Sequence, residues 1–280
     1  YPNYYEASAQ LYETFQQWSS PSAIFIGFNN INFDEPFLRQ ALYQNLMPEI
    51  YMTVTNNNVR MDVFEILRLV SVYSPEHIKF NTDDQGYPIL KLEEIFKKNN
   101  ISISYEAGPH DAVFDSLVTL ELNKILSIRC PQIWKSAYDF RLRETPKKFL
   151  LDHLVFTNTT FWGRRPTIKA QTLIAGIPGK NHHYLVYNLL FDPKKLQDLD
   201  DKELIKKMND GVKRICEVFD GSKSKTLLNE SYCFKDSKFA EIGVDELRSR
   251  ANFIKNNEEF CSRLIQLHID NQKKWPDPFN

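Results

Sequence analysis

The sequence predicts an α/β fold, because a short apolar run typical of a buried strand is followed by segments in which apolar residues recur at helical spacing. Residues 23–27 are apolar, rich in β-branched side chains and bounded by turn-forming residues, as expected of a strand buried on both faces of a sheet. Helical spacing follows in residues 35–45 and again in residues 62–73. A strand set among helices in this way indicates an α/β domain.

The other helices of this first part are predicted from the same spacing and from their end signals. Apolar residues recur at helical spacing in residues 5–18, 90–99 and 111–129. Asp62 and Asp111 stand at the expected N-caps of two helices, where a short carboxylate can accept a backbone N–H. Turn-forming residues at 19–22 and 81–86 separate these elements.

From about residue 141 the pattern changes to short strands separated by turns that contain glycine or proline. The expected strands are residues 157–160, 167–174 and 183–190. Helical spacing returns in residues 203–219 and 245–268. We therefore expect an α/β domain over residues 1–140, a small β-rich domain over residues 141–232 and the start of a helical region over residues 233–280.

Length and composition predict an ordinary globular protein. With 280 residues, of which 42% are hydrophobic and 25% charged, the chain can bury a full core and divide into two or three domains. Its 35 Lys and Arg against 36 Asp and Glu give a formal net charge of −1. The overall charge therefore does not indicate a polyanionic partner, and a nucleic-acid-binding surface would have to be a local basic patch.

The sequence predicts no membrane segment, zinc site or disulfide framework. Its longest apolar stretches, such as residues 23–28, are far shorter than the roughly 18 residues that cross a bilayer. Cys130, Cys216, Cys233 and Cys261 lie far apart and form no CxxC pair. We therefore expect a cytoplasmic protein whose thiols are reduced and at least half-buried.

Two clusters of polar residues could carry chemistry. In residues 27–34, GFNNINFD, Asp34 follows the predicted strand, and in residues 110–115, HDAVFD, His110 precedes Asp115 by five positions. Taken singly, each has an ordinary explanation, because an Asp after a strand is commonly a turn or cap residue and a His before a helix is commonly loop polarity. The order and spacing of the two clusters together indicate more.

The clusters resemble the second and third motifs of the DEDD class of 3′–5′ exonucleases, and residues 23–131 are similar to bacterial exonuclease I in particular. The likeness extends to Arg39, four residues after Glu35, and to residues 60–62 at the start of a predicted helix. It continues more weakly over nearly the whole chain. The resemblance implies an RNase H-like α/β exonuclease domain, a small SH3-like β-barrel domain and a C-terminal helical region.

The same resemblance implies the roles of the site residues. It makes Asp34 and Asp115 ligands of two Mg²⁺ ions, or of Mn²⁺ in their place, since hard oxygen donors suit both metals. It makes His110 the general base, and an imidazole that titrates near neutrality suits that role. The implied activity is 3′ to 5′ hydrolysis of single-stranded DNA to nucleoside 5′-monophosphates in DNA repair or recombination, by a monomer that has the single-stranded DNA-binding protein as a partner.

A basic stretch is the best candidate for a surface that holds DNA. Residues 141–169 contain two acidic residues and seven Lys or Arg, which are Arg141, Arg143, Lys147, Lys148, Arg164, Arg165 and Lys169. Phe161 and Trp162 adjoin them and could stack on bases while the cations neutralise phosphates. The alternative is a solvated charged face with two core aromatics. For Arg39 and Arg60, surface ion pairs and contacts to DNA phosphates are both open.

The sequence departs from the family at the first motif, an Asp-x-Glu that should supply the remaining acidic ligands. No such motif precedes Ser22, and the Asp-x-Glu at residues 201–203 is better explained by helix capping. We therefore expect an RNase H-like domain that lacks its first strands. Two other functions stay open: a single-stranded DNA-binding module that cannot cut, and a 3′–5′ exoribonuclease, because the metal chemistry serves RNA as well.

Overall fold

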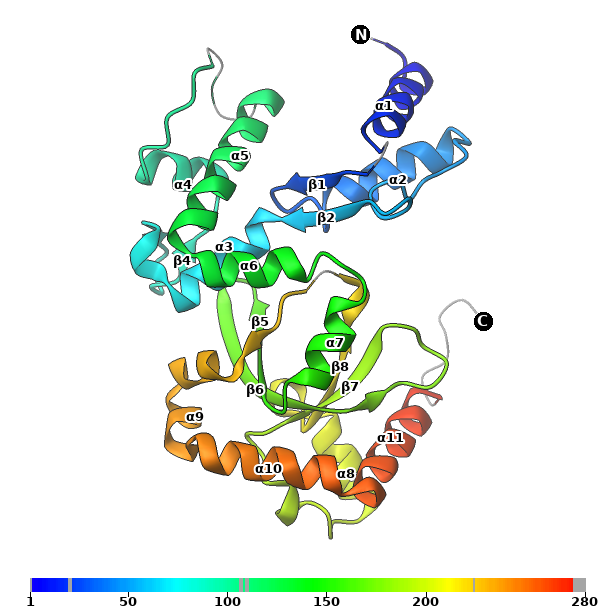
Figure 1. Ribbon diagram of the computed structural model, residues 1–280, viewed down its shortest axis with the longest axis vertical. Coiled ribbons are helices and arrows are strands. Elements are labelled where there is room, and N and C mark those ends of the chain that lie inside the picture. The colour runs from blue at the N-terminus through cyan, green and yellow to red at the C-terminus, as the bar shows by residue number, and fades with distance from the viewer. Residues whose placement is uncertain (1, 20–21, 106–107, 109–110, 224, 274–280) are drawn as a thin grey trace. The chain divides into compact units, whose positions relative to one another are not determined.

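The chain forms two compact units, an N-terminal unit of residues Tyr1–Leu142 and a C-terminal unit of residues Arg143–Asn280 (Figure 1). The computed structural model describes residues 2–273, apart from residues 20, 21, 106, 107, 109, 110 and 224. No helix among the described residues has the length and apolar character needed to span a bilayer.

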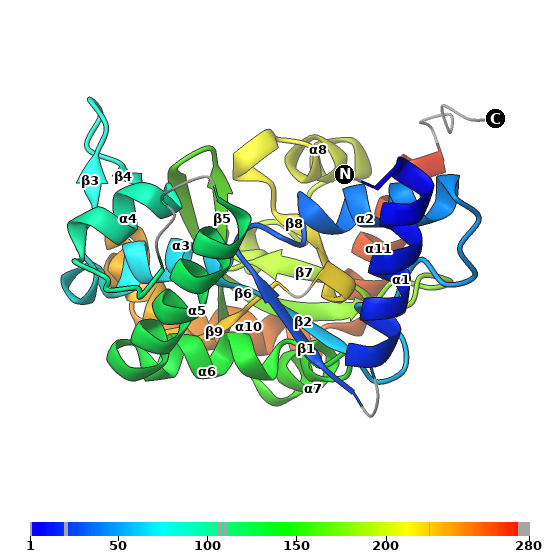
Figure 2. The ribbon, with the colours of Figure 1, turned by 90° about the horizontal axis from the view of Figure 1, so that it is seen from above.

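A two-stranded parallel sheet organises the N-terminal unit. Strand β1 (Ile24–Gly27) pairs with β2 (Val59–Asp62) so that Ile24 faces Val59 and Gly27 faces Asp62. Helix α2 (Asp34–Gln44) lies on the connection between the strands, and α1 (Tyr4–Trp18) precedes β1. Figure 2 shows the two strands side by side, with α1 crossing near their N-terminal ends.

The strand predicted at residues 23–27 is present, but its predicted burial on both faces is wrong. Phe25 stacks on Phe15 of α1, with ring centroids 5.2 Å apart. Ile24 and Ile26, on the other face, are 40% and 39% exposed. Among the described residues β1 pairs only with β2, and the face that carries Ile24 and Ile26 is left partly open to solvent.

Helices α5 (Ala112–Arg129) and α6 (Pro131–Asp139) pack against α3 (Val63–Tyr73), whose buried face carries Ile66, Leu67 and Val70, and α4 (Leu92–Lys98) packs against α5. Helices α4 and α5 were predicted, and α6 was not. Strands β3 (Asn81–Thr82) and β4 (Pro88–Ile89) form a short hairpin before α4. Helix α5 contacts α3, α4, α6 and β1, so it joins the helices to the sheet.

An antiparallel sheet with strand order β8-β7-β6-β5-β9 forms the centre of the C-terminal unit. Its strands are β5 (Phe156–Trp162), β6 (Arg165–Gly176), β7 (His183–Asn188), β8 (Cys216–Asp220) and β9 (Leu228–Asn229). The first three were predicted. The helix predicted at residues 203–219 is wrong, because α8 (Asp201–Met208) ends early and residues 216–220 pair with β7 instead.

Helices and sheet share one core in the C-terminal unit. The helices are α7 (Thr145–Asp152), α8, α9 (Ser237–Ile242), α10 (Val244–Asn256) and α11 (Glu258–Lys273). Leu185 and Tyr187 of β7 are buried in the same cluster as Phe239, Leu247 and Leu264 of the C-terminal helices. The helix predicted at residues 245–268 is divided at Asn257, whose side chain accepts the backbone N–H of Phe260 at 3.0 Å.

Short 3-10 helices complete the described chain. They are η1 (Pro75–His77), η2 (Pro193–Lys195), η3 (Gly211–Lys213), η4 (Gly221–Lys223) and η5 (Glu230–Lys235).

Candidate functional site

The segment that leaves β1 turns sharply and delivers Asp34 to the first position of α2. Asn29 has a φ of 60°, and the N–H of Phe33 donates to the Asn29 carbonyl at 3.0 Å. At Gly27 a Cβ atom would lie 2.5 Å from the Cβ of Asn30, so only glycine permits the close approach of that side chain. The turn leaves Asp34 exposed to solvent, so its carboxylate is accessible to a bound ion or substrate.

Asp62, at the end of β2, holds this turn in place. One of its carboxylate oxygens, Oδ1, accepts the N–H of Asn29 at 2.7 Å and caps α3 by accepting the N–H of Phe64 at 3.0 Å. The other, Oδ2, accepts the N–H of Ile31 at 3.4 Å. Burial raises the pKa of Asp62 to about 6, against the opposing effect of these hydrogen bonds. Its capping role was predicted, and its hold on the turn was not.

Glu35, next to Asp34, is buried and paired with two arginines. Its Oε2 accepts a hydrogen bond from Arg39 Nη2 at 2.7 Å and another from Arg60 Nη1. Glu35 is only 3% exposed, and the Arg39 guanidinium also lies over the ring of Tyr51. Of the two interpretations of Arg39 and Arg60, the structure shows ion pairs, although with a buried rather than a surface carboxylate. The spacing of Glu35 and Arg39 by four residues was the signal for the first pair.

Asp115 lies in the first turn of α5, half-buried. Asp111 caps this helix as predicted, since its Oδ1 accepts the N–H groups of Val113 and Phe114 at 3.0 Å each. The contact of α5 with β1 brings this helix to the sheet strand that precedes Asp34. His110, the expected general base, lies outside the described residues.

The donor chemistry of Asp34 and Asp115 fits Mg²⁺. This ion prefers oxygen ligands and commonly takes one or two carboxylates, with substrate phosphates and water filling the remaining positions. Within the described ranges, however, no three His, Cys, Asp or Glu side chains lie close enough together to hold a metal ion. The described part of the chain therefore offers two candidate carboxylates and no complete protein cage.

Both aromatic residues of the predicted DNA surface, and two of its basic residues, lie at the tip of the β5–β6 hairpin. Trp162 is 85% exposed there, and Gly163, with a φ of 60°, begins the turn to Arg164 and Arg165, both exposed. Phe161, opposite Pro166 in the strand register, is half-buried.

The other predicted basic residues do not share one setting. Arg143, Lys147 and Lys148 are exposed at the start of the C-terminal unit. Arg141 belongs to the N-terminal unit, where its guanidinium lies 3.5 Å from the centroid of the Tyr138 ring and donates to the Tyr138 carbonyl. Arg141 is thus half-buried against the C-terminal end of α6, and the predicted basic stretch is divided between the two units.

Lys169, expected in the same basic surface, is instead buried. Its Nζ pairs with Glu217 Oε2 at 2.5 Å, and it is 6% exposed. Glu217 Oε1 also accepts hydrogen bonds from the side-chain amides of Asn158 and Gln171. The reason is sheet register: Asn158 faces Lys169, so alternate side chains of β5 and β6 point to one face. The expectation that Lys169 contacts DNA is therefore wrong.

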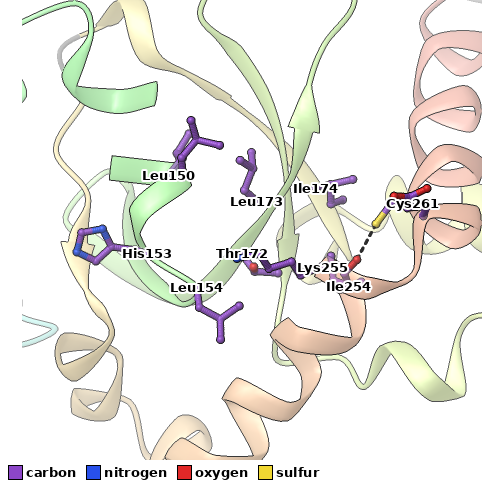
Figure 3. A pocket seen from close by; sticks show the side chains of 11 residues that line it. Leu150, His153, Leu154, Thr172, Leu173, Ile174, Ile254, Lys255 and Cys261 are labelled. Carbon is purple, nitrogen blue, oxygen red and sulfur yellow. Dashed lines mark hydrogen bonds between the residues drawn. The ribbon is translucent and has the colours of Figure 1, made fainter. Parts of the chain in front are cut away.

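A pocket of about 220 Å³ lies in the C-terminal unit, and its lining includes none of the predicted site residues (Figure 3). Leu150, His153, Leu173 and Ile254 contribute to its mainly apolar lining, and Cys261 donates to the Ile254 carbonyl at 3.1 Å. Burial raises the pKa of the Cys261 thiol to about 11. This pocket therefore lacks the convergent acids and the reactive thiol that would make it a candidate active site.

The curated relatives of the chain share one name. A protein from Buchnera aphidicola subsp. Schizaphis graminum is 32% identical over 139 residues, and one from Escherichia coli strain K12 is 24% identical over 188 residues; both are named exodeoxyribonuclease I. The chain is similar to exodeoxyribonuclease I. The matched segments cover 50% and 66% of this chain but only 28% and 39% of those relatives. No family model matches the chain.

Solved structures of exonuclease I share the fold. That of the moderately thermophilic enzyme from Methylocaldum szegediense matches 95% of this chain with a TM-score of 0.75 and 22% identity. The Escherichia coli enzyme in complex with a dA16 oligonucleotide matches 95% of this chain with a TM-score of 0.73 and 18% identity. This chain covers 58% and 59% of those two chains. The chain thus has the α/β architecture of exonuclease I over a part of its length.

Proposed function

We propose that the chain is part of a 3′ to 5′ exodeoxyribonuclease that hydrolyses single-stranded DNA and releases nucleoside 5′-monophosphates. The observation that carries the proposal is the similarity to exodeoxyribonuclease I in both sequence and fold. One of the matching exonuclease I structures is a complex with a dA16 oligonucleotide, which supports a single strand as the substrate. A role in DNA repair or recombination accords with such an activity.

In this proposal Asp34 and Asp115 hold Mg²⁺, or Mn²⁺, through carboxylate oxygens. Two such ions would supply the activation of water and the stabilisation of the leaving oxygen of the phosphodiester. His110 takes the proton of the attacking water. Support comes from the placement of both carboxylates in the first turns of helices, next to backbone fixed by Asp62 on one side and by Asp111 on the other.

The finer fold follows the same likeness. We place an RNase H-like exonuclease domain over residues 1–140, to which the parallel pair β1–β2 and its crossover helix α2 belong. An SH3-like domain over residues 141–232 would contain the antiparallel sheet, and a helical region would begin at residue 233. The shared core of sheet and C-terminal helices then makes the last two parts one folding unit.

Single-stranded DNA would be held in the C-terminal unit by Trp162, with Phe161, and by the neighbouring basic residues. An exposed indole offers a stacking face for any base, and the cations neutralise phosphates without sequence preference. We assign the phosphate contacts to Arg143, Lys147, Lys148, Arg164 and Arg165. We place the protein in the cytoplasm as a monomer that interacts with the single-stranded DNA-binding protein, and a solved SSB/exonuclease I complex supports that partner.

Two labelled versions of one single-stranded oligonucleotide test the activity. With Mg²⁺, the 3′-labelled strand should release labelled mononucleotide at once, whereas the 5′-labelled strand should shorten progressively. Chelation of the metal should stop both reactions, and Asp34→Asn, Asp115→Asn and His110→Ala should each abolish most of the rate. Full activity of all three variants would contradict the mechanism, and release of labelled mononucleotide from the 5′ end first would contradict the polarity.

A binding module without catalysis is the second candidate. It is favoured by the metal site, because the described residues provide two candidate ligands and no group of three. Tight Mg²⁺-independent binding of the strand with no release of nucleotide would establish this function instead. Cleavage of the matching RNA oligonucleotide in preference to DNA would identify an exoribonuclease.

A further inference from the structure

We infer that Arg60 and Asp62 of β2 are positioning residues for the Asp34 carboxylate: they clamp the backbone on both sides of it. The inference rests on the proposed function, because it assigns the two residues a role in that reaction. Neither side chain is placed to be a ligand itself, since each is occupied by a partner within the fold. Both act through the segment of residues 29–35.

The first clamp acts before Asp34. The carboxylate of Asp62 accepts the backbone N–H of Asn29 through one oxygen and that of Ile31 through the other. Backbone N–H groups in a turn have no partner within a helix or sheet, so a buried carboxylate that accepts two of them fixes the course of the turn. The turn begins with Asn29 at a positive φ, a conformation that asparagine tolerates better than most residues, and Asp62 holds its N–H there.

The second clamp acts directly after Asp34. Glu35 is buried, and Arg60 pairs with its carboxylate from the neighbouring strand. Arg39 pairs with the same carboxylate from within α2, whereas the pair with Arg60 ties the first turn of α2 to β2 and so limits its rotation about the helix axis. Asp34 is the preceding residue of the same turn, and its direction is therefore set by that rotation.

Both clamps originate on β2, at alternate positions of one strand. In the parallel register Arg60 faces Phe25 and Asp62 faces Gly27, the last residue of β1. A third contact ties the other end of β1, because the side chain of Asn58 accepts the N–H of Ala23 at 2.8 Å. Strand β2 thus serves as a template along which β1 and the following turn are aligned. Such support of a functional side chain by neighbouring residues decides its precision, and a displacement of about 1 Å can cost a hundredfold in rate.

A purely structural role for Asp62 is the alternative to be separated, because its carboxylate also caps α3 through Phe64. Asp62→Asn keeps an amide oxygen that can cap the helix but replaces the second acceptor, so the turn loses one of its ties. Asp200→Asn is a matched control, since Asp200 caps α8 in the C-terminal unit by accepting the N–H of Glu203 at 2.8 Å. For the second clamp, Arg60→Met removes the cation and Arg60→Lys retains a positive charge.

The test combines hydrogen exchange with kinetics on the full chain. In Asp62→Asn and Arg60→Met we expect faster exchange of the amides of residues 29–35, a roughly 10- to 100-fold fall in kcat, a KM for single-stranded DNA within about twofold of wild type and a higher Mg²⁺ requirement. Arg60→Lys should recover part of kcat, and Asp200→Asn should leave kcat and exchange in this segment unchanged.

The outcomes separate this inference from the proposed function. An active wild type together with unchanged kcat and exchange in folded Asp62→Asn and Arg60→Met would overturn the inference alone. A fall in thermal stability with unchanged kcat would do the same and leave a structural role. A wild type that releases no nucleotide with Mg²⁺ would overturn the proposed function and, with it, the catalytic role of the clamps.

Discussion

The carboxylate of Asp62 accepts the backbone N–H of Asn29 at 2.7 Å, across the end of the parallel strand pair. A side chain at the last position of β2 thereby fixes the residue at which the chain turns away from β1. Asp62 is 5% exposed. The carboxyl group that holds the turn is therefore an ionisable group in the interior. Its titration should have a measurable effect on the free energy of unfolding.

Folding should become less favourable as pH rises through the titration of Asp62. Burial raises its pKa from 3.8 to about 6, so between these values the unfolded chain releases a proton that the folded chain retains. The contribution of this group to stability is complete only well below pH 3.8 and falls by roughly 3 kcal/mol once pH exceeds about 7. Urea denaturation of wild type and Asp62→Asn between pH 4.5 and 7.5 measures this. Parallel pH profiles of the two proteins would show that Asp62 does not titrate in this range.

Gly27→Ala should destabilise the N-terminal unit by about 1–3 kcal/mol, because the new Cβ would overlap the Asn30 side chain at 2.5 Å. Gly176→Ala in β6 is the control, since a Cβ there meets no atom within 4 Å. Thermal unfolding followed by circular dichroism compares the two. Equal melting temperatures would mean that the Asn30 side chain can move away from the new Cβ without loss of stability.

Trp162→Ala should weaken binding of single-stranded DNA by about 5- to 150-fold without loss of stability, because an indole that is 85% exposed contributes little to folding and stacking is worth about 1–3 kcal/mol per base. Fluorescence anisotropy of a labelled oligonucleotide gives the Kd. Ile128→Ala, which removes a side chain 78% exposed in the N-terminal unit, is the control. An unchanged Kd in Trp162→Ala would show that the tip of the β5–β6 hairpin is not part of the DNA-binding surface.

Each of Lys147→Ala and Lys148→Ala should lower the salt dependence of that binding. If a lysine neutralises one phosphate, its removal should reduce the slope of log K against log salt by about 0.7 for a single strand. Lys202→Ala, an exposed lysine of α8, should leave the slope unchanged. If neither substitution in α7 changes the slope or the affinity, the DNA phosphates do not contact these two lysines.

Glu217→Leu should cost about 3–5 kcal/mol, since it strands the buried ammonium of Lys169 without its counter-ion. The double variant Lys169→Met with Glu217→Leu should lose less, because no buried charge then lacks a partner. Chemical denaturation of the single and double variants provides the comparison. A smaller fall in stability for the single variant than for the double would show that the pair is not coupled.

Much of the fold could be predicted from the sequence where a segment's own pattern decides its structure. Strand β1 and helices α1, α2, α3 and α5 lie where their apolar periodicity placed them. Strand β2 escaped prediction because it has four residues and owes its form to pairing with β1. Strand β8 looked helical because Ile215 and Phe219 are four residues apart, and pairing with β7 overrides that spacing.

Two helices that begin with proline in their first turn were not predicted. The helix of residues 111–129 ends before Pro131 as expected, but the helix that follows it and the helix around Pro146 were missed. In the structure both prolines occupy the first turns of new helices, α6 and α7, where the missing N–H has no partner to lose. The same residue type that stops one helix thus starts the next.

The candidate site was predictable in its motif residues and not in its supports. Asp34 lies just after the predicted strand and Asp115 lies in the first turn of a predicted helix, as expected from the sequence. The metal-ligand roles of Asp34 and Asp115 and the role of His110 as general base stay predictions. The hold of Asp62 on Asn29 and the burial of Glu35 and Lys169 depend on sheet register between distant segments. A single sequence does not contain that register.

The pairing of β1 with β2 also has a kinetic consequence. These strands must find each other across the whole of α2 and the loop after it, whereas β5, β6 and β7 join as successive hairpins. Loop closure is slower over longer separations, so the hairpins of the C-terminal unit should assemble first and the parallel pair should form late. The turn that carries Asp34 would then be among the last parts of the chain to acquire its final conformation during refolding.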